Sequence, residues 1–319
     1  MCIALISTAH PLYSLIVIDN RDEFLHRPTS SPDWWPEPSS FVLGSRDLAR
    51  SEHGTWMGIT KHGKIAVLTN YREQKSAEAI GWHSRGKIVN SWLTSPPAEQ
   101  QTTLEFVQSM VASPEAKQVG GFSLVCGYVN EPLAIVSNRS HNMEQVIWVA
   151  SEKNQTRGLS NTRFEDRTWP KIIEGEKLME AAIKEHTQAQ EDEDALLERL
   201  LQVLSTDTLP RLPKESSLDD YVPLIPKSIF VPVVGTEVAA AYAEDENKKS
   251  PSDGPMDPRF FSGPYGTQKQ TILLVQSNGR VRYLERTLYD NQAHAIPVGQ
   301  GDKCFEFTIQ PETASRNGH

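Results

Sequence analysis

The sequence of 319 residues is short of cysteine, of positive charge and of long apolar stretches. Its three cysteines, Cys2, Cys126 and Cys304, have no CxxC spacing, so the sequence predicts neither a disulfide framework nor a zinc site. Basic side chains number 32 against 41 acidic ones, and this balance argues against a general nucleic-acid binder. No apolar stretch approaches the roughly 20 residues that a membrane-spanning helix needs. We therefore expect a soluble protein of a reducing compartment, without integral membrane association.

The residues that are present suit a folded globular protein. Hydrophobic residues make up 38% of the chain and charged residues 23%, which is enough apolar material for a large core. The first six residues are mostly apolar, but Ser7, Thr8, His10 and Pro11 soon interrupt them. We expect a strand here and not a signal peptide.

Apolar periodicity and turn residues predict strands that are followed by helices and then by further strands. The predicted strands are 1–6, 13–18, 41–44, 55–60, 64–70, 122–129, 132–136, 146–150, 270–276, 280–286 and 304–309, and the predicted helices are 86–93, 99–111, 172–183 and 195–204. A segment at 238–258 is poor in large apolar residues and is predicted to be a flexible insertion, and 311–319 is predicted to be a frayed tail. This order favours two packed sheets with helices outside, in one domain over 1–310.

One cysteine has an unusual position, because Cys2 follows the initiator methionine directly. If Met1 is removed, the chain begins with a residue that carries both a thiol and a free α-amine. The amine has a reference pKa of about 7.7–8.0, so part of it is unprotonated at neutral pH and can take the thiol proton. Cys2 is therefore a candidate nucleophile. The alternative is a small residue at a chain start, with Cys126 and Cys304 as core residues in apolar strands.

The second strand ends in the polar sequence Asn20-Arg21-Asp22-Glu23. A hairpin of the first two strands would bring this end close to Cys2, where Arg21 could lower the thiol pKa and Asp22 could orient the amine. Strand alternation puts Arg21 and Asp22 on opposite faces, so both can face Cys2 only if the strand bends. The alternative interpretation is a salt-bridged surface turn.

Several spaced motifs resemble the NRDE family, also called the transport and Golgi organization protein 2 family. They cover nearly the whole chain. The motifs are Met1-Cys2-Ile3, Asn20-Arg21-Asp22-Glu23-Phe24, Arg27-Pro28, Gly54-Thr55-Trp56-Met57-Gly58-Ile59, Leu68-Thr69-Asn70-Tyr71-Arg72, Ser84-Arg85-Gly86, Gly158-Leu159-Ser160-Asn161, Trp169-Pro170-Lys171, Tyr265-Gly266-Thr267 and Glu285-Arg286.

The resemblance implies an α+β fold, a four-layer αββα sandwich of the N-terminal nucleophile hydrolase type. Related enzymes of that type are cysteine amidases that cleave bile-salt and penicillin V amides. By this resemblance, Cys2 is nucleophile and base, Arg21 stabilises the thiolate, Asp22 binds the α-amine, Asn70 donates to the oxyanion, and Asn161 positions nucleophile and substrate. Substrate-binding roles are assigned to Asn20, Trp56, Tyr71 and Gln268. The alternative for Asn70 and Asn161 is that each ends a strand as a turn residue.

The chain departs from the family pattern at one position. After Tyr265-Gly266-Thr267 the family commonly has an arginine, whereas this chain has Gln268 followed by Lys269. Lys269 could supply the charge, but strand alternation predicts that it points the other way. The departure weakens the case for intact amidase chemistry.

The resemblance implies an intracellular protein that acts in Golgi organization and protein secretion, on a scaffold that binds haem or an acylated lipid metabolite as its ligand. No cofactor or metal is expected to be required, haem being a transported ligand. We expect it in the cytoplasm, with peripheral association with the Golgi or with mitochondria. The alternative is an N-terminal cysteine amidohydrolase that cleaves a non-peptide C–N bond of a small acylated substrate.

Overall fold

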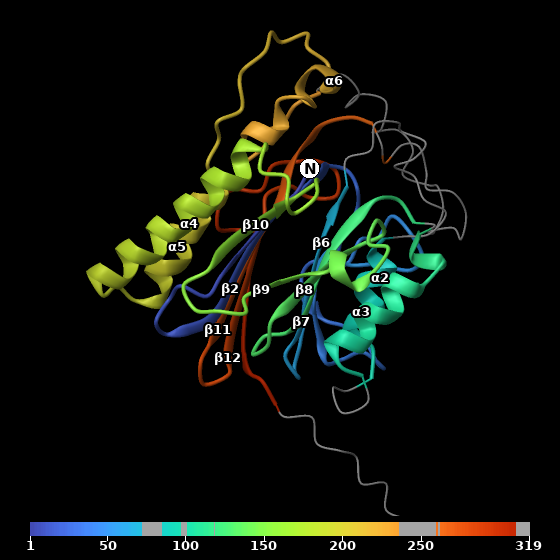
Figure 1. The fold of residues 1–319 in the computed structure, drawn as a ribbon. Coiled ribbons are helices and arrows are strands. Elements are labelled where there is room, and N and C mark those ends of the chain that lie inside the picture. Colours follow the sequence, from blue (N-terminus) through green and yellow to red (C-terminus); the bar gives the residue numbers. More distant parts are fainter. Residues whose placement is uncertain (72–84, 97–100, 118, 236–259, 261, 311–319) are drawn as a thin grey trace, which may run out of the picture.

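The structure is a computed structural model that describes residues 1–71, 85–96, 101–117, 119–235, 260 and 262–310. In this part of the chain two antiparallel sheets face one another, and helices cover their outer faces (Figure 1). The flexible insertion predicted at 238–258 and the frayed tail predicted at 311–319 lie outside the described residues.

The first sheet has six strands in the order β10-β1-β2-β11-β12-β13, and the second has seven in the order β3-β4-β5-β6-β7-β8-β9. The strands of the first sheet are β1 (Ile3–Ser7), β2 (Tyr13–Phe24), β10 (Thr156–Ser160), β11 (Tyr265–Gln276), β12 (Arg280–Thr287) and β13 (Asp302–Thr308). Those of the second are β3 (Asp33–Trp34), β4 (Val42–Gly44), β5 (Met57–Thr60), β6 (Lys64–Asn70), β7 (Phe122–Tyr128), β8 (Leu133–Ser137) and β9 (Ile147–Val149).

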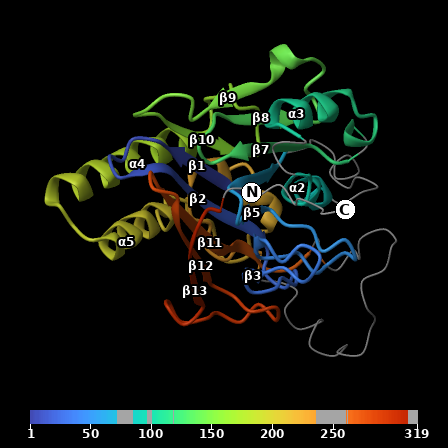
Figure 2. The same ribbon diagram turned by 90° about the horizontal axis from the view of Figure 1, so that it is seen from below.

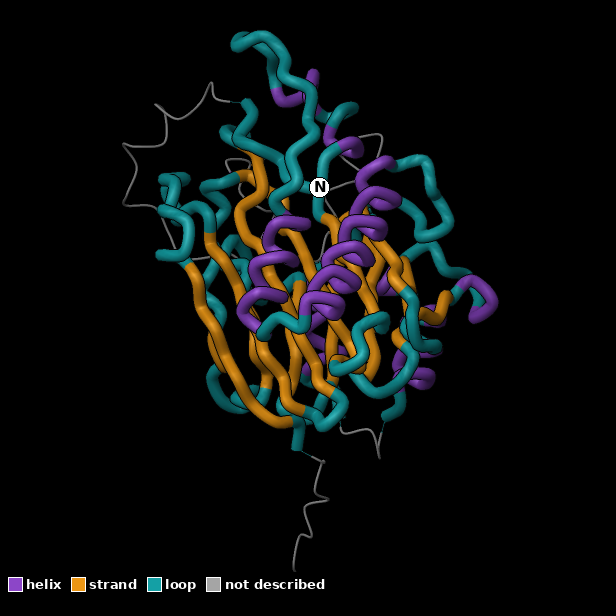
Figure 3. Tube along the Cα trace, turned by 90° about the vertical axis from the view of Figure 1, so that its left-hand side faces the viewer, coloured by secondary structure: helices purple, strands orange, loops and turns teal. Residues whose placement is uncertain are grey.

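Two helices pack on the outside of each sheet. Helices α4 (Pro170–Ala189) and α5 (Glu193–Leu204) cover the first sheet, and α2 (Gly86–Leu93) and α3 (Thr103–Ala112) cover the second (Figure 2). Figure 3 shows α4 and α5 crossing in front of the strands. The short elements are η1 (Glu115–Lys117), η2 (Met143–Gln145), α6 (Leu218–Tyr221) and η3 (Ile225–Lys227).

Three apolar cores fill the spaces between the four layers. The core between the sheets contains Val17 of β2 and Val67 of β6. The core under α4 and α5 contains Ile16 and Ile18, which alternate with Val17 along the same strand. The third core lies between the second sheet and α2 and α3. A strand covered on both faces is apolar at consecutive positions, so this packing explains the near-continuous apolar runs of the first hairpin. The predicted four-layer αββα arrangement is confirmed.

The predicted elements lack two edge strands, β3 and β10, and misjudge one cysteine. Strand β10 contains Gly158, where an added Cβ would lie 3.0 Å from side chains of Leu5 and Ile172. The strand needs a small residue at this contact with α4, so it lacks the β-branched run that signals a strand. Cys126 is fully buried as predicted, but Cys304 is exposed on the edge strand β13, so its prediction as a core residue is wrong.

Among the helices in the described ranges, none combines the length and the apolar character that would be needed to cross a membrane.

Candidate functional site

Cys2 lies at the start of the central hairpin of the first sheet. Strand β1 pairs with β2 on one side and with β10 on the other. In this register Ile3 is paired with Ser160 of β10 and with Asn20 of β2. Cys2 is therefore flanked by Arg21 and Asn161, at the end of the sheets where Figure 1 marks the N-terminus. The predicted hairpin brings these residues together.

The carboxylate of Asp22 lies beside the N-terminal amine. The Met1 amine is 3.8 Å from Asp22 Oδ2 and donates a 3.2 Å hydrogen bond to the Asp22 carbonyl oxygen. Thr267 Oγ1 donates to Asp22 Oδ1 at 2.7 Å. Lys171 Nζ is 3.9 Å from Asp22 Oδ2 and donates to the Met1 carbonyl oxygen at 2.8 Å. The side chains of Asp22 and Lys171 are fully buried, so these charges interact with little screening by water.

Burial destabilises the charged forms of Asp22, Lys171 and the Met1 amine, and the opposite charges of their neighbours stabilise them. Desolvation raises the pKa of Asp22, while the Met1 amine and Lys171 act in the opposite direction. Desolvation likewise lowers the pKa of the Met1 amine and that of Lys171, and Asp22 counteracts both shifts. Each charged form is therefore maintained by its partners, so removal of one partner disturbs the others.

Arg21 and Asp22 lie on opposite faces of β2, as strand alternation requires. Asp22 faces helix α4 through Lys171, whereas Arg21 lies between the sheets over the ring of Trp56. The strand does not have to bend to bring both side chains to one face, because they contact different groups. The Asp22 carboxylate lies near the N-terminal amine, and the Arg21 guanidinium lies on the inter-sheet face.

The guanidinium of Arg21 is already paired. It donates to the side-chain oxygen of Gln268 and, at 3.2 Å, to Asp47 Oδ2. Its carbon atom lies 4.6 Å from the centroid of the Trp56 ring. Asp47 also binds Arg27 at 2.6 Å, and these two arginines lower the Asp47 pKa against the effect of burial. The predicted thiolate stabiliser is thus held in a chain of ion pairs.

Gln268 positions Arg21, and Lys269 reaches the same region. The Gln268 amide nitrogen donates to the carbonyl oxygens of Leu25 and Arg27, at 3.0 and 3.1 Å, which leaves its oxygen to accept from Arg21. The register between β11 and β2 shifts between Thr267 and Lys269. Lys269 Nζ consequently lies 5.8 Å from the Trp56 ring centroid, on the inter-sheet side. The alternation argument for Lys269 is wrong because this bulge breaks the period of two.

Lys269 is neutralised where it lies. Its ammonium is 2.7 Å from Glu285 Oε1 and donates to the Ser30 carbonyl oxygen at 3.0 Å. Both side chains of the pair are buried. Lys269 therefore balances a buried carboxylate and does not supply a free cation to Cys2.

The thiol of Cys2 is protonated at neutral pH in this arrangement. Only 7% of the residue is exposed, and its sulfur contacts the Asp22 carbonyl oxygen at 4.0 Å. Burial raises the pKa of the thiol to about 11, although the Met1 amine acts in the opposite direction. With Met1 in place, the nitrogen of Cys2 is a peptide nitrogen and cannot act as a base.

The two asparagines predicted for the oxyanion and the substrate come from different sheets. Thr69 Oγ1 donates to the Ser160 carbonyl oxygen at 3.0 Å, which joins the end of β6 to the end of β10. Ser160 Oγ in turn donates to the Cys2 carbonyl oxygen at 2.6 Å. Asn70 and Asn161 follow these linked residues directly. Asn161 is buried and Asn70 is half-buried, so both lie at the end of the sandwich that holds Cys2.

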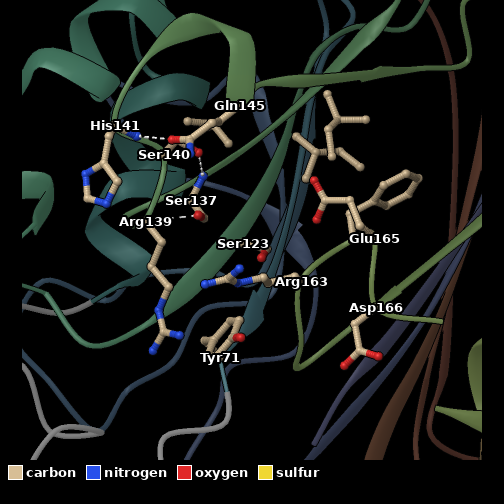
Figure 4. A pocket seen from close by; sticks show the side chains of 14 residues that line it. Tyr71, Ser123, Ser137, Arg139, Ser140, His141, Gln145, Arg163, Glu165 and Asp166 are labelled. Carbon is tan, nitrogen blue, oxygen red and sulfur yellow. Dashed lines mark hydrogen bonds between the residues drawn. The ribbon is translucent and has the colours of Figure 1, made fainter. Parts of the chain in front are cut away.

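Two predicted substrate-binding residues lie elsewhere. The Asn20 amide nitrogen donates to the carbonyl oxygens of Leu204 and Ile229, at 2.7 and 3.0 Å, on the helix-covered face of β2. Asn20 therefore does not lie in the site where a substrate-binding role was predicted for it, because strand alternation directs its side chain away from the inter-sheet face. Tyr71 lines a cavity whose lining does not include Cys2, and there the Arg139 guanidinium lies 3.7 Å from the Tyr71 ring centroid (Figure 4).

Three residues to which the sequence pattern assigns no role complete the N-terminal site: Lys171, Thr267 and Ser160. A signal for Lys171 was present. It stands four and eight residues before Gly175 and Met179, and all three are buried on one face of α4. A lysine on the apolar stripe of a helix is seldom buried without a partner.

Within the described residues no group of three or more His, Cys, Asp or Glu side chains could hold a metal ion. Two of the described histidines, His10 and His186, form a pair whose ring nitrogens lie 3.1 Å apart. This pair joins the β1–β2 turn to the end of α4.

Comparison with known proteins identifies the chain's relatives. The family model described as Transport and Golgi organisation 2 matches residues 1–290. A Transport and Golgi organization protein 2 homolog from Bos taurus is 30% identical over 306 residues, covering 93% of this chain and 94% of that protein. The homolog from Homo sapiens is 28% identical, with the same coverages. Transport and Golgi organization protein 2 from Drosophila melanogaster is 24% identical and covers 88% of this chain and 89% of its own length.

Two solved structures show weaker similarity. A variant of conjugated bile acid hydrolase from Clostridium perfringens has a TM-score of 0.43 and 11% identity, covering 99% of this chain and 100% of that one. The Caenorhabditis elegans ortholog of N-acylethanolamine-hydrolyzing acid amidase has a TM-score of 0.34 and 12% identity, covering 71% and 98%. The motifs read from the sequence and the match over residues 1–290 agree: the chain belongs to the Transport and Golgi organisation 2 family.

Proposed function

We propose that this chain is a ligand-binding protein that acts in Golgi organization and protein secretion, with haem or an acylated lipid metabolite as its ligand. It acts in the cytoplasm and associates peripherally with the Golgi or with mitochondria. Family membership supports the cellular role. The N-terminal site serves as part of a binding scaffold and needs no resident cofactor.

The pairing of Arg21 is the observation that carries this proposal. A reactive cysteine needs a cation that lowers the thiol pKa. Here Arg21 is shared between Asp47 and Gln268, and the amine next to Asp22 belongs to Met1. With Met1 in place, the buried thiol of Cys2 therefore has no base of its own, and Arg21, its predicted stabiliser, is shared with other partners. This state favours binding over nucleophilic attack.

Rescue of protein secretion tests the proposal. Cells that lack this protein receive the wild type, Cys2→Ala or the matched control Cys304→Ala, which changes an exposed cysteine. All three are expected to restore secretion of a reporter protein to the same level. Loss of rescue by Cys2→Ala alone would contradict the binding role.

Two titrations test the ligand. The purified chain is titrated with haemin, followed at the Soret band, and with N-lauroylethanolamide, followed by calorimetry and by release of laurate. We expect one of the two to bind without turnover, with affinities of wild type and Cys2→Ala within about twofold of each other. Failure of both probes to bind would overturn the ligand-binding proposal.

One observation favours the alternative, an N-terminal cysteine amidohydrolase. Asp22 Oδ2 is buried and accepts no hydrogen bond within the described residues, although the Met1 amine and Lys171 lie 3.8 and 3.9 Å away. If Met1 were removed, the new amine of Cys2 could use this oxygen, and Lys171 would lower the amine pKa toward the neutral form that a base requires.

Intact-mass measurement separates the two functions. A chain that retains Met1 excludes the hydrolase. A chain that begins at Cys2 and releases laurate from N-lauroylethanolamide, with turnover lost in Cys2→Ala, would establish the hydrolase instead of the scaffold.

A further inference from the structure

A cavity whose lining does not include Cys2 lies between the end of β6, the β8–β9 connection and the turn that follows β10. Its volume is about 660 Å³, within the range of small-molecule sites. Figure 4 shows its polar side chains converging from these segments. From its charge and its walls we propose that this cavity binds an amphiphile, with an anionic group held by Arg139 and Arg163 and an apolar chain lying along Ile147 and Phe164.

The two arginines supply the anion-binding end. The Arg139 guanidinium stacks on Tyr71, 3.7 Å from the ring centroid, and this contact fixes the plane of its donors. Arg163 lines the cavity, and in the described part of the chain its side chain makes no hydrogen bond or ion pair. Figure 4 shows Arg163 extending across the cavity toward Tyr71. Two guanidinium groups on one cavity are suited to a carboxylate or a phosphate, which they bind with paired donors.

Hydroxyl groups complete this end of the cavity. Ser137 Oγ accepts from the Arg139 backbone nitrogen, and Ser140 Oγ accepts from the Ser137 backbone nitrogen, both at 3.1 Å. The hydroxyl oxygens of Ser137 and Ser140 both accept hydrogen bonds within the loop. Their hydroxyl hydrogens can therefore be donated to a ligand. The buried Ser140 thus presents a donor to an anion and not a further acceptor.

Within the described residues, the carboxylates of the cavity form no ion pair with Arg163. Asp166 accepts from Thr162 Oγ1 at 2.6 Å and from the backbone nitrogen and hydroxyl of Thr168, at 2.9 and 2.6 Å. These bonds close the turn after β10. Figure 4 shows Asp166 and Glu165 on the side of the cavity away from Tyr71 and Arg139.

An adjoining cavity of about 550 Å³ is lined by Ile147 and Phe164 together with the charged residues Arg157, Glu165 and Arg167. The two cavities share Ile147, Phe164 and Glu165 in their linings. Ile147 and Phe164 are partly exposed and also pack on the inter-sheet core. A chain that leaves the arginines along these two side chains would bury apolar surface on both.

Calorimetric titration of the full chain tests this site, with dodecyl phosphate, laurate, neutral dodecyl maltoside and inorganic phosphate as probes below their micelle concentrations. We expect at least one of the two anionic amphiphiles to bind at least tenfold more tightly than dodecyl maltoside and inorganic phosphate. Tighter binding of dodecyl phosphate than of laurate identifies a phosphate site, and the reverse identifies a carboxylate site. Equal binding of dodecyl maltoside, or equal binding of inorganic phosphate, would overturn the proposal.

Two variants assign the binding to the cavity. Arg163→Gln, an exposed position, is expected to weaken binding of the tighter amphiphile by about tenfold or more, because a charge-assisted hydrogen bond is lost. Lys153→Gln removes the same charge from an exposed residue that does not line the cavity, and it should leave binding unchanged. Equal effects of the two substitutions would mean that net charge alone is measured, which contradicts the site. Cys2 is not among the residues that line the cavity, so this test does not depend on the role proposed for the N-terminal site.

Discussion

The ammonium group of Lys171 donates a 2.8 Å hydrogen bond to the carbonyl oxygen of Met1. Helix α4 therefore holds the first peptide of the chain from the outer face of the sheet. Because the same ammonium lies 3.9 Å from Asp22 Oδ2, the N-terminus, the helix and strand β2 share one buried group of charges.

Replacement of Lys171 by methionine is expected to destabilise the fold strongly. The substitution leaves the Met1 carbonyl oxygen and the Asp22 carboxylate buried with one cation fewer, and loss of one partner of a buried ion pair costs about 3–5 kcal/mol. Urea denaturation measures the change in the free energy of unfolding. Lys177→Met, at an exposed position of the same helix, is the control and should change it by less than about 0.5 kcal/mol. Similar values for the two variants would contradict the role of Lys171.

The thiol of Cys2 should react slowly at neutral pH while Met1 is present. Because its pKa is raised to about 11, the rate of alkylation by iodoacetamide should rise about tenfold per pH unit from pH 7.5 to 9.5 without a plateau. Mass spectrometry of peptides measures the rate separately from that of the exposed Cys304. A plateau with a midpoint near 8.5 or below would show that the thiol is not buried in this way.

The same raised pKa has a consequence for stability. The unfolded thiol loses its proton near its ordinary pKa of 9.0, whereas the folded thiol keeps it until about 11. The unfolded state binds fewer protons between these values, so the free energy of unfolding should fall as the pH rises from 9 to 11. The decrease should be smaller in Cys2→Ala than in the wild type. An equal decrease would contradict the assignment.

Gln268 should be required for the position of Arg21. In Gln268→Leu the Arg21 guanidinium loses an acceptor, and the carbonyl oxygens of Leu25 and Arg27 lose a donor, which costs about 1–3 kcal/mol for a buried unsatisfied group. Thermal and urea denaturation measure the loss of stability. Gln292→Leu changes an exposed glutamine and should be nearly neutral. A neutral Gln268→Leu would mean that Arg21 is held by Asp47 alone.

The His10–His186 pair should make stability depend on pH under mildly acidic conditions. His10 Nδ1 accepts from the Leu12 backbone nitrogen, so His10 Nε2 donates to His186 Nδ1, and His186 Nε2 donates to the Asp192 carbonyl oxygen. Burial, together with the unfavourable interaction of a protonated His10 with the His186 ring, lowers the His10 pKa to about 4 from its ordinary 6.5. The unfolded state therefore binds the proton first, and stability should fall as the pH decreases from 6.5 to 4.

Denaturation at several pH values compares the wild type with His10→Gln. The fall in stability between pH 6.5 and 4 should be smaller in the variant, which cannot take up the proton. If the two curves run parallel over this range, the histidine pair is not the group that titrates.

The sequence predicts those helices and strands whose own residue pattern is strong. The ranges 64–70 and 86–93 coincide with β6 and α2, and the Asn278-Gly279 turn joins β11 to β12. Strand β10 was missed because an edge strand with a glycine at a helix contact shows no alternation. The first residues of β11, from Tyr265, were missed because their polar side chains are buried by other segments of the chain.

The sequence by itself determined the layers of this fold and the meeting of Cys2 with Arg21 and Asp22, because periodicity and a short hairpin act between neighbours along the chain. The tertiary structure alone decided that Arg21 is paired with Asp47, that Lys171 holds Met1, and that Arg139 and Arg163 line one cavity. These pairs join residues from separate elements. The distances between these residues depend on how the sheets and helices pack. A contact between side chains of two different layers produces no periodic pattern in the sequence of either segment, so the sequence cannot reveal it.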